Sequence, residues 1–483
     1  MTDVLGVLVI ARNGDRWEYH QDPKTYEGAY TESTALGAAE SHQLGAFLRS
    51  VYMSSSSPSY IANMKTDLVD THEVHVQVKA GGEGTVIFDS AVALLQGLFP
   101  PNPANKIVLA NETTVIAPLG GYQYVPIETV EPGNDRSLEP WTDCPAFEQH
   151  ISNVYSSSEF KQTEKAAGPF FNAVRDYVYG RPTTLENAIY DYISTGLSYN
   201  KTFAHRLPPT LVEQARGFAN YHENAVFSDK EVGGIGNLAG RTILHTILSN
   251  LQRIAFNGDP LQFLLVETSY QPFISLFHML ELTKQNPELA GIPNYASALA
   301  FELRRGPAPE FRDFVRIKFK NGTNGDFETH HAFGHKSDIA ATEFIYKIEN
   351  YAISSGKQWA AACNSGLEGD IFHIGSQDTI SSTVFYILAA VFLFGMFVLS
   401  KFVKSARAKA QKSRIRLADD EVSQSHLPQS QYPNYGTLPN VCPGIAFLNR
   451  AEHLLVHYRT SLLSPLPRVR SSVSPCKRRS SRS

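Results

Sequence analysis

Residues 5–19 read Leu-Gly-Val-Leu-Val-Ile-Ala-Arg-Asn-Gly-Asp-Arg-Trp-Glu-Tyr, and the fold class is inferred first from this segment. Its apolar run, residues 7–11, predicts a buried strand, because a short apolar run that ends at a turn signal is typical of a strand covered on both faces. The run stops at Arg12, and Gly14 supplies the turn. Arg12 and Arg16 are therefore expected at the carboxyl end of the strand, where α/β proteins place ligands.

Two further segments follow the pattern of an α/β protein. Residues 31–52 carry apolar side chains at helical spacing, which predicts an amphipathic helix. Residues 73–79 alternate between apolar and polar side chains and predict a strand, a glycine-rich loop follows, and residues 86–98 predict a helix. Strand, loop and helix in this order are typical of a parallel α/β sheet.

The later segments predict more elements of the same kind. Residues 238–257 predict a long amphipathic helix, residues 261–266 an apolar strand, and residues 273–282 another helix. Residues 310–320 alternate and predict an antiparallel edge strand or the arm of a hairpin. Residues 338–363 have helical spacing and are expected to close the body of the protein.

The first strand and its turn resemble the signature of the histidine acid phosphatases, in the phosphoglycerate-mutase-like superfamily. In that family the strand is followed by Arg-His-Gly-x-Arg. Here Arg12 and Arg16 match the arginines, while Asn13 replaces the histidine. Residues 34–52 and residues 80–101 match two further family blocks, the second of which ends in Phe-Pro-Pro.

The resemblance covers about residues 4–370 and has implications for the fold. It implies a mixed, mainly parallel sheet with helices on both faces. A helical lobe inserted at about residues 140–235 would complete a phosphatase-like domain over residues 1–375.

The resemblance also implies a catalytic set, most of which this sequence lacks. The family histidine attacks phosphorus, but Asn13 cannot do so, because the lone pair of its amide nitrogen is delocalised into the carbonyl group. Counting back from the Phe-Pro-Pro block places Val86 at the third phosphate-binding arginine. Counting back from the helix at 273–282 places Ser269 and Tyr270 at the acid pair, and no His-Asp pair occurs in the chain.

Three losses after three separate strands indicate abandoned chemistry. They predict a pseudo-phosphatase that acts as a binding or scaffold module. The alternative is an active acid phosphatase or phytase-like phosphomonoesterase with a non-standard site, whose nucleophile would be Asp15, Ser269 or Glu267. Nothing in the spacing supplies Ser269 with a base.

A phosphate or a phosphoester could still bind to what remains, because guanidinium groups and the free amides of a helix start both bind anions. The anion-binding candidates are Arg12, Arg16, Gly81, Gly82, Gly84 and Thr85. Two plainer interpretations stay open. The glycines only permit a sharp turn, and the arginines pair with the nearby carboxylates of Asp15 and Glu83.

Residues 379–400 read TISSTVFYILAAVFLFGMFVLS and carry no charge over 22 residues, which predicts a transmembrane helix. Seven lysines and arginines follow within residues 401–416, so the positive-inside rule places the tail in the cytoplasm. This tail, residues 401–483, has a net charge of +11, whereas the first 400 residues carry −15. Its lack of hydrophobic periodicity predicts that it is largely disordered.

The lipid bilayer is therefore a predicted partner, and the body is expected in the lumen or outside the cell. Asn111, Asn200 and Asn321 begin N-x-[ST] sequons, which agree with that location. Cys144 and Cys363 either form a disulfide, as in an oxidising compartment, or are two buried thiols. No signal peptide is visible, so the true start lies upstream, or the spanning helix delivers the body, or the body stays in the cytosol.

Other ligand classes are not expected. The acidic body argues against nucleic-acid binding, and the sequence indicates no particular protein partner. His330, His331 and His335 lie close together in the sequence but lack further ligands, so a surface or packing role is expected rather than a metal site. No metal and no cofactor are predicted.

Overall fold

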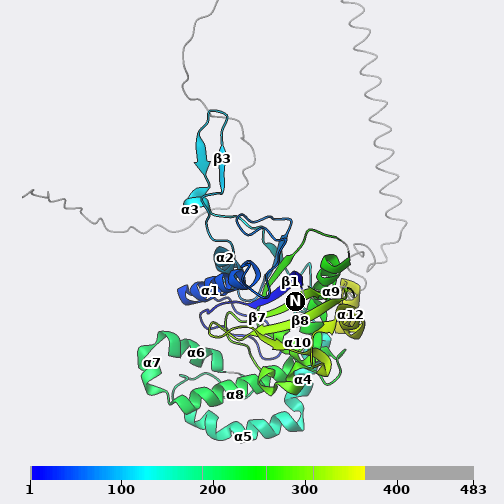
Figure 1. Ribbon diagram of the computed structural model, residues 1–483. Coiled ribbons are helices and arrows are strands. Elements are labelled where there is room, and N and C mark those ends of the chain that lie inside the picture. Colours follow the sequence, from blue (N-terminus) through cyan, green and yellow to red (C-terminus); the bar gives the residue numbers. More distant parts are fainter. Residues whose placement is uncertain (1–2, 188, 257, 308, 310, 365–483) are drawn as a thin grey trace, which may run out of the picture. The chain divides into compact units, whose positions relative to one another are not determined.

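The computed structural model describes residues 3–364, apart from residues 188, 257, 308 and 310. Within this part of the chain an eight-stranded sheet has the order β10-β8-β7-β1-β6-β2-β5, with β9 also paired to β8. The strands of this sheet are β1 (Asp3–Arg12), β2 (Val74–Lys79), β5 (Glu128–Val130), β6 (Phe263–Thr268), β7 (Ala298–Arg305), β8 (Asp313–Lys320), β9 (Glu328–His330) and β10 (Ile339–Ala340). A separate hairpin, β3 (Lys106–Val108) with β4 (Thr114–Ile116), projects from the body in Figure 1.

The sheet has a parallel half and an antiparallel half. β6 is parallel to β1 and to β2, and β2 is parallel to β5, as the repeated strand–helix pattern predicts. β7 was not predicted, and it pairs antiparallel with both β1 and β8. β8 is thus the arm of a hairpin, but the expectation of an edge strand is wrong, because β9 and β10 pair with β8 as well.

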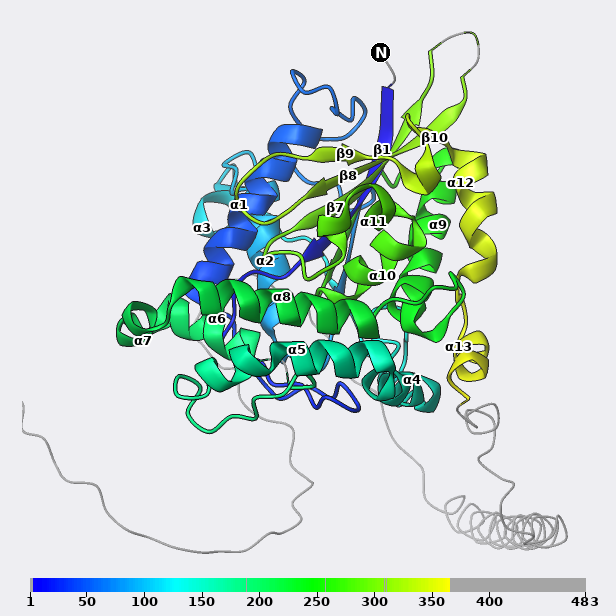
Figure 2. The same cartoon turned by 90° about the horizontal axis from the view of Figure 1, so that it is seen from below.

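Helices cover both faces of the sheet, which confirms the predicted α/β class. Val7 and Val9 of β1 pack on the face that α1 and α2 cover, whereas Leu8 and Ile10 pack on the face that α9, α10 and α12 cover. Figure 2 shows these two groups of helices on opposite sides of the strands. The helices of these layers are α1 (Ala35–Tyr52), α2 (Val86–Leu98), α9 (Leu238–Phe256), α10 (Gln271–Met279), α11 (Leu282–Gln285) and α12 (Ala341–Ile348).

Five helices of the central part of the chain form a layer of their own, seen below the sheet in Figure 1. Most of them share a separate apolar core, which contains Phe160, Phe170 and Phe203, whereas Phe147 and Ile151 belong to another cluster with Leu238 and Ile274. These helices are α4 (Pro145–Ser156), α5 (Ser158–Val174), α6 (Tyr190–Tyr199), α7 (Lys201–Arg206) and α8 (Pro209–Val226). They lie within residues 140–235, for which the resemblance implied a helical lobe.

A disulfide joins Cys144 to Cys363. Cys144 precedes α4 and Cys363 ends α13 (Gly356–Cys363), so of the two alternatives that the sequence left open, the structure has the bond. A short helix, α3 (Pro118–Gly121), follows the β3–β4 hairpin. None of the described helices combines the length and the hydrophobicity needed to cross a membrane. The predicted span at 379–400 and the tail at 401–483 lie outside the described residues.

Candidate functional site

A cavity of about 580 Å³ lies at the carboxyl ends of β1 and β6, between the sheet and helices α6 and α8. Six tyrosines, four arginines and seven aspartate or glutamate side chains contribute to its wall. The carboxylates outnumber the guanidinium groups, so the cavity disfavours a ligand that carries several negative charges.

β1 delivers Arg12 and the following loop to this cavity. Arg12 is the last residue of β1 and pairs in register with Thr268 of β6. Gly14 allows the loop to lie against the start of α1, because a Cβ at this position would come within 2.1 Å of the Gly37 carbonyl oxygen. The Gly14 N–H also donates to Ser90 Oγ of α2 at 3.1 Å. The turn is therefore fixed by close packing against two helices.

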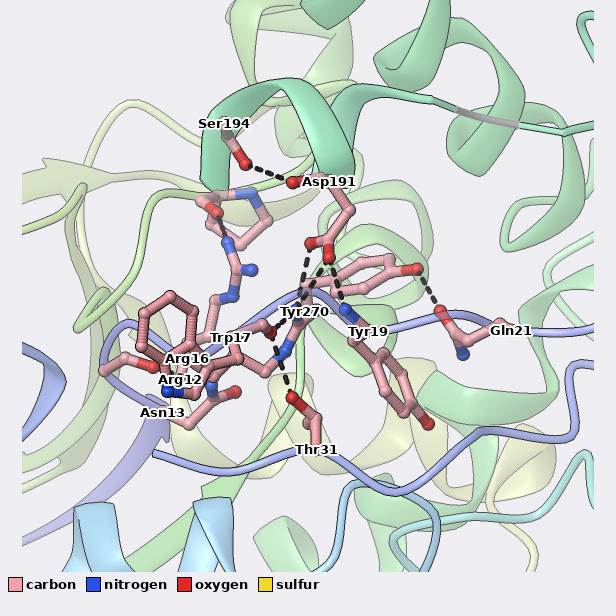
Figure 3. Close-up of polar contacts among 12 residues, drawn as sticks. Arg12, Asn13, Arg16, Trp17, Tyr19, Gln21, Thr31, Asp191, Ser194 and Tyr270 are labelled. Atoms are coloured by element: carbon pink, nitrogen blue, oxygen red, sulfur yellow. Dashed lines mark hydrogen bonds and ion pairs between the residues drawn. The ribbon is translucent and has the colours of Figure 1, made fainter. Parts of the chain in front are cut away.

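Arg16 is held by a carboxylate from the helical layer (Figure 3). Its Nη1 donates to both carboxylate oxygens of Asp191 at 3.0 Å and to the Trp17 carbonyl oxygen at 3.1 Å. Asp191 lies in the first turn of α6, and its Oδ2 also accepts the backbone N–H of Tyr19 at 2.6 Å. Burial lowers the pKa of Arg16, but the combined effect of Asp191, Tyr295 and Glu83 outweighs burial and raises this pKa.

Arg12 lines the same cavity, but its contacts are neutral. Its Nη1 donates to the Pro293 carbonyl oxygen, and its guanidinium carbon lies 4.2 Å from the centroid of the Tyr295 ring. Burial lowers the pKa of Arg12, although the side chain keeps its charge because a guanidinium ionises far above neutral pH. Its Nε has no hydrogen-bond partner among the residues that the structure describes.

Asn13 does not contribute to the cavity wall, although it lies between the two arginines in the sequence. The residue is 1% exposed, and its Nδ2 donates to the Gly14 carbonyl oxygen at 2.8 Å. Its backbone N–H donates to the Thr268 carbonyl oxygen at 3.2 Å, and its own carbonyl accepts the Ala296 N–H at 3.1 Å. The Asn13 side chain therefore stabilises the loop and offers no nucleophile to a ligand.

Asp15 lines the cavity without pairing with either arginine, which corrects one expectation. Its Oδ2 accepts hydrogen bonds from Thr34 Oγ1 at 2.6 Å and from the Tyr199 hydroxyl group. Its backbone N–H donates to Glu40 Oε2 at 2.9 Å. Burial raises the pKa of Glu40, against the opposing effect of that hydrogen bond.

The glycine loop after β2 is closed by an ion pair of its own. Lys79, the last residue of β2, donates to Glu83 Oε2 at 2.8 Å and lies 3.6 Å from Glu139. Lys79 and Glu83 are both almost completely buried. Glu83 therefore neutralises this lysine, whereas it was expected to be a partner of the arginines.

The proposed anion-binding residues of this loop do not form part of the cavity wall. Gly81, Gly82 and Gly84 adopt positive φ angles of 119°, 57° and 68°, which favour glycine. Thr85 Oγ1 donates to Asp89 Oδ2 at 3.0 Å. The structure thus brings Arg12 and Arg16 together but separates them from the four loop residues, and it favours the interpretation that the glycines permit the turn.

Of the positions that the resemblance implied for the third arginine and the acid pair, only Tyr270 reaches the cavity. Val86 is completely buried at the start of α2. Ser269 is buried too, and its hydroxyl group donates to Gln271 Oε1. The Tyr270 hydroxyl group donates to Glu223 Oε2 at 3.0 Å.

Glu267 cannot act as the alternative nucleophile in this arrangement. Its side chain is 0% exposed on β6, and neither carboxylate oxygen has a hydrogen-bond partner in the described part of the chain. Burial raises the pKa of Glu267 well above its usual value, which disfavours the carboxylate form that a nucleophile requires.

Sequence reasoning missed two groups of the cavity wall, both from the helical layer. One is Asp191, the partner of Arg16. The other is Glu223 of α8, which lies 2.9 Å from His222 Nδ1 and accepts the Tyr26 hydroxyl group at 3.1 Å. The only signal for Glu223 in the sequence is that it follows His222. This His-Glu pair lies far from the strand at 261–266, after which the family resemblance places the acid pair.

The histidines near the carboxyl end of the body make separate contacts. His330 Nδ1 lies 3.3 Å from Asn286 Nδ2, and His335 Nε2 lies 3.2 Å from Glu343 Oε1. Within the part of the chain that the structure covers, no group of three or more His, Cys, Asp or Glu side chains is placed to hold a metal ion.

Comparison with known families agrees with this geometry. A profile of the histidine phosphatase superfamily (branch 2) matches residues 12–320, which is more than half of the chain. The chain belongs to this superfamily. Its match begins at Arg12, the last residue of β1, and includes β6, α6 and α8, which also contribute to the cavity.

Two curated acid phosphatases match parts of the chain at low sequence identity. The chain is 22% identical to testicular acid phosphatase of Homo sapiens over 314 residues, which cover 62% of this chain and 67% of that protein. It is 26% identical to prostatic acid phosphatase of Bos taurus over 163 residues, which cover 32% of this chain and 37% of that protein.

Solved structures of the superfamily share the fold. The Citrobacter braakii phytase superimposes with a TM-score of 0.50 at 11% identity, over 74% of this chain and 99% of that one. The Klebsiella sp. ASR1 phytase gives a TM-score of 0.51 at 11% identity, over 74% and 96% of the two chains. At this identity the likeness concerns the fold alone, so the function of this histidine phosphatase relative has to be argued from its own cavity.

Proposed function

We propose that this chain is a catalytically inactive member of its superfamily, a pseudo-phosphatase that works as a binding or scaffold module. The observation that carries the proposal is Asn13, which stands where the family places its nucleophile. The Asn13 amide is buried and bonded to the carbonyl group of Gly14. Neither Val86 nor Ser269 restores a missing group, since both side chains are buried away from the cavity.

The test is an assay of phosphate release from p-nitrophenyl phosphate, from acidic to neutral pH, with the full chain. We expect no turnover above that of a heat-denatured sample. We also expect the N13H variant to be inactive, because the third arginine and the acid pair are still missing. Turnover by the wild-type chain that persists in N13A would instead identify another nucleophile.

The rival proposal is an active acid phosphatase or phytase-like phosphomonoesterase. It is favoured by the names of the relatives and by two groups of the cavity wall, the Asp15 carboxylate and the His222–Glu223 pair. In its described contacts, however, Glu223 accepts hydrogen bonds, whereas a general acid must present a proton. Loss of hydrolysis in D15N, with retained folding, would establish this rival.

We further propose that the body is anchored to a membrane by residues 379–400 and faces the lumen or the exterior. The disulfide supports this location, because such bonds persist in oxidising compartments. Asn111, Asn200 and Asn321 are all exposed, so each sequon is accessible to modification. A mobility shift after glycosidase treatment tests the proposal. An unglycosylated, membrane-free chain in the native host would contradict it.

A further inference from the structure

The contact between Arg16 and Asp191 has the features of an occupied anion site. Asp191 places both carboxylate oxygens 3.0 Å from Arg16 Nη1, and one of them also accepts the Tyr19 N–H at 2.6 Å. A guanidinium group together with a backbone amide is a typical pair of donors for a phosphate or sulfate group. These donors come from the loop after β1, whereas the anion comes from α6, which lies 175 residues away in the sequence.

Asp191 uses only part of what this site can donate. In the described structure it bonds to one nitrogen of the Arg16 fork, and the Nε atoms of Arg16 and of Arg12 have no hydrogen-bond partner there. A tetrahedral oxyanion has more oxygens and a higher charge than a carboxylate, and it can accept from two edges of a guanidinium group. The contacts with Asp191 thus leave some guanidinium donors of the site unused.

We propose that Asp191 is an internal competitor for this oxyanion site, and that it sets the affinity of the cavity for a ligand with a single terminal phosphate or sulfate group. The ligand binds by displacing the Asp191 carboxylate from Arg16. The inference rests on the proposed function, since it concerns a cavity that binds without turnover.

Two further observations agree with displacement. The Asp191 side chain is 26% exposed, whereas that of Arg16 is 4% exposed, so the carboxylate is the partner that solvent reaches. Ile193 is the one buried residue of α6, and Tyr190, Tyr192 and Leu197 also pack against the core of the helical layer, so displacement is expected to move the Asp191 side chain and not the helix. A single phosphate group suits the site because the remaining carboxylates of the wall would repel additional ones.

The test measures binding of inorganic phosphate to the full chain by isothermal titration calorimetry at constant ionic strength. In the variant Asp191→Asn the amide is isosteric but cannot neutralise Arg16. We expect Asp191→Asn to bind phosphate at least about tenfold more tightly than the wild-type chain, and the double variant D191N/R16A to lose this gain.

The matched control is Glu186→Gln, which removes one negative charge from another part of the same cavity wall. Affinity for phosphate should change much less in E186Q than in D191N. An equal gain in both variants would overturn the proposal, because it would show a general charge effect. So would equal affinity of the wild-type chain and D191N, or a gain that survives R16A.

Circular dichroism establishes that each variant is folded, and Asp191→Ser replaces the amide variant if the latter does not fold. Phosphate release from p-nitrophenyl phosphate is measured on the same samples. Hydrolysis by the wild-type chain would refute the pseudo-phosphatase proposal and leave the competition result standing. Absence of a gain in folded D191N and D191S would refute the competitor and leave the pseudo-phosphatase proposal standing.

Discussion

The strands β1 and β2 each deliver a buried cation to the same edge of the sheet, but the two ion pairs are built differently. Lys79 forms an ion pair with Glu83, four residues later in the sequence, and each of these side chains is 1% exposed. Arg16 pairs with Asp191 of α6, which lies 175 residues later in the sequence, and the Asp191 side chain is 26% exposed. The pair of Lys79 and Glu83 is enclosed in the fold, whereas the pair of Arg16 and Asp191 borders the cavity.

The difference shows which of the two loops can still bind a ligand. At the end of β2, Glu83 fills the space beside the cation, and a second carboxylate, Glu139, lies 3.6 Å from the lysine. An external anion would have to enter a dry, neutralised cluster. At the end of β1, Arg16 and Asp191 both contribute to the cavity wall, and the Asp191 side chain is 26% exposed. Whether an external anion can bind beside a buried cation therefore depends on which part of the chain supplies the carboxylate partner, as well as on the presence of the cation.

The largest expected effect comes from breaking the enclosed pair of Lys79 and Glu83. Lys79→Met leaves Glu83 and Glu139 buried without a counter-charge, which is expected to lower the free energy of unfolding by about 3–5 kcal/mol. Urea denaturation followed by circular dichroism measures the loss. The double variant K79M/E83Q should recover much of it. A loss below about 1 kcal/mol for K79M would mean that water or another group compensates these carboxylates.

A second prediction concerns Glu267, on the strand between β1 and β2. Glu267 pairs in register with Ala11 and Val78, and it has no cation beside it in the described structure. Burial raises its pKa, so the folded chain keeps a proton that the unfolded chain loses above pH about 4.5, and stability falls as the pH rises. Glu267→Gln should remove this loss, which amounts to about 1.4 kcal/mol for each pH unit between the two pKa values.

The check is a series of urea denaturation curves at increasing pH. E267Q and the wild-type chain should have similar stability near pH 4 and diverge above it, with the variant more stable. The control is Glu302→Gln on β7. Glu302 is also 0% exposed, but its carboxylate lies 2.9 Å from Lys318 Nζ and 3.2 Å from Arg304 Nε. E302Q should therefore destabilise the chain, and stabilisation by both substitutions would contradict the assignment.

The hydrophobic periodicity of the sequence was sufficient to predict the strand and the helix on either side of the glycine-rich loop. The helix predicted at 86–98 is α2, and the strand predicted at 73–79 is β2, because each buries the apolar face that its pattern marks. β7 escaped prediction because Glu302 and Arg304 interrupt its apolar pattern. Their charges are compensated by long-range contacts that the sequence does not show, since Glu302 pairs with Arg304 and with Lys318 of β8, and Arg304 also donates to the Pro58 carbonyl oxygen.

Only those residues of the candidate site that lie together in one short segment of the sequence were predictable. The positions of Arg12 and Arg16 follow from one strand and one turn. Their partners do not, because Asp191 and Pro293 reach them from segments 175 and 281 residues away. Asp15 was expected as a partner because it lies between the arginines in the sequence, and Glu83 because it lies in the glycine-rich loop. Each of them instead has a nearer donor, in Thr34 or Lys79.

The smallest expected effect concerns the pair of Arg16 and Asp191. Asp191→Asn keeps a side-chain oxygen that can accept from the Tyr19 N–H or from Arg16, and Glu83 still acts on the Arg16 charge, so the free energy of unfolding should fall by only about 1–2 kcal/mol. Added phosphate should restore this loss in D191N, because a ligand that binds only the folded state stabilises it. The same phosphate should not restore K79M, whose uncompensated groups are carboxylates. Thermal unfolding with phosphate or with chloride at equal ionic strength makes the comparison. If phosphate stabilises both variants equally, the two ion pairs do not differ in the way that their exposure indicates.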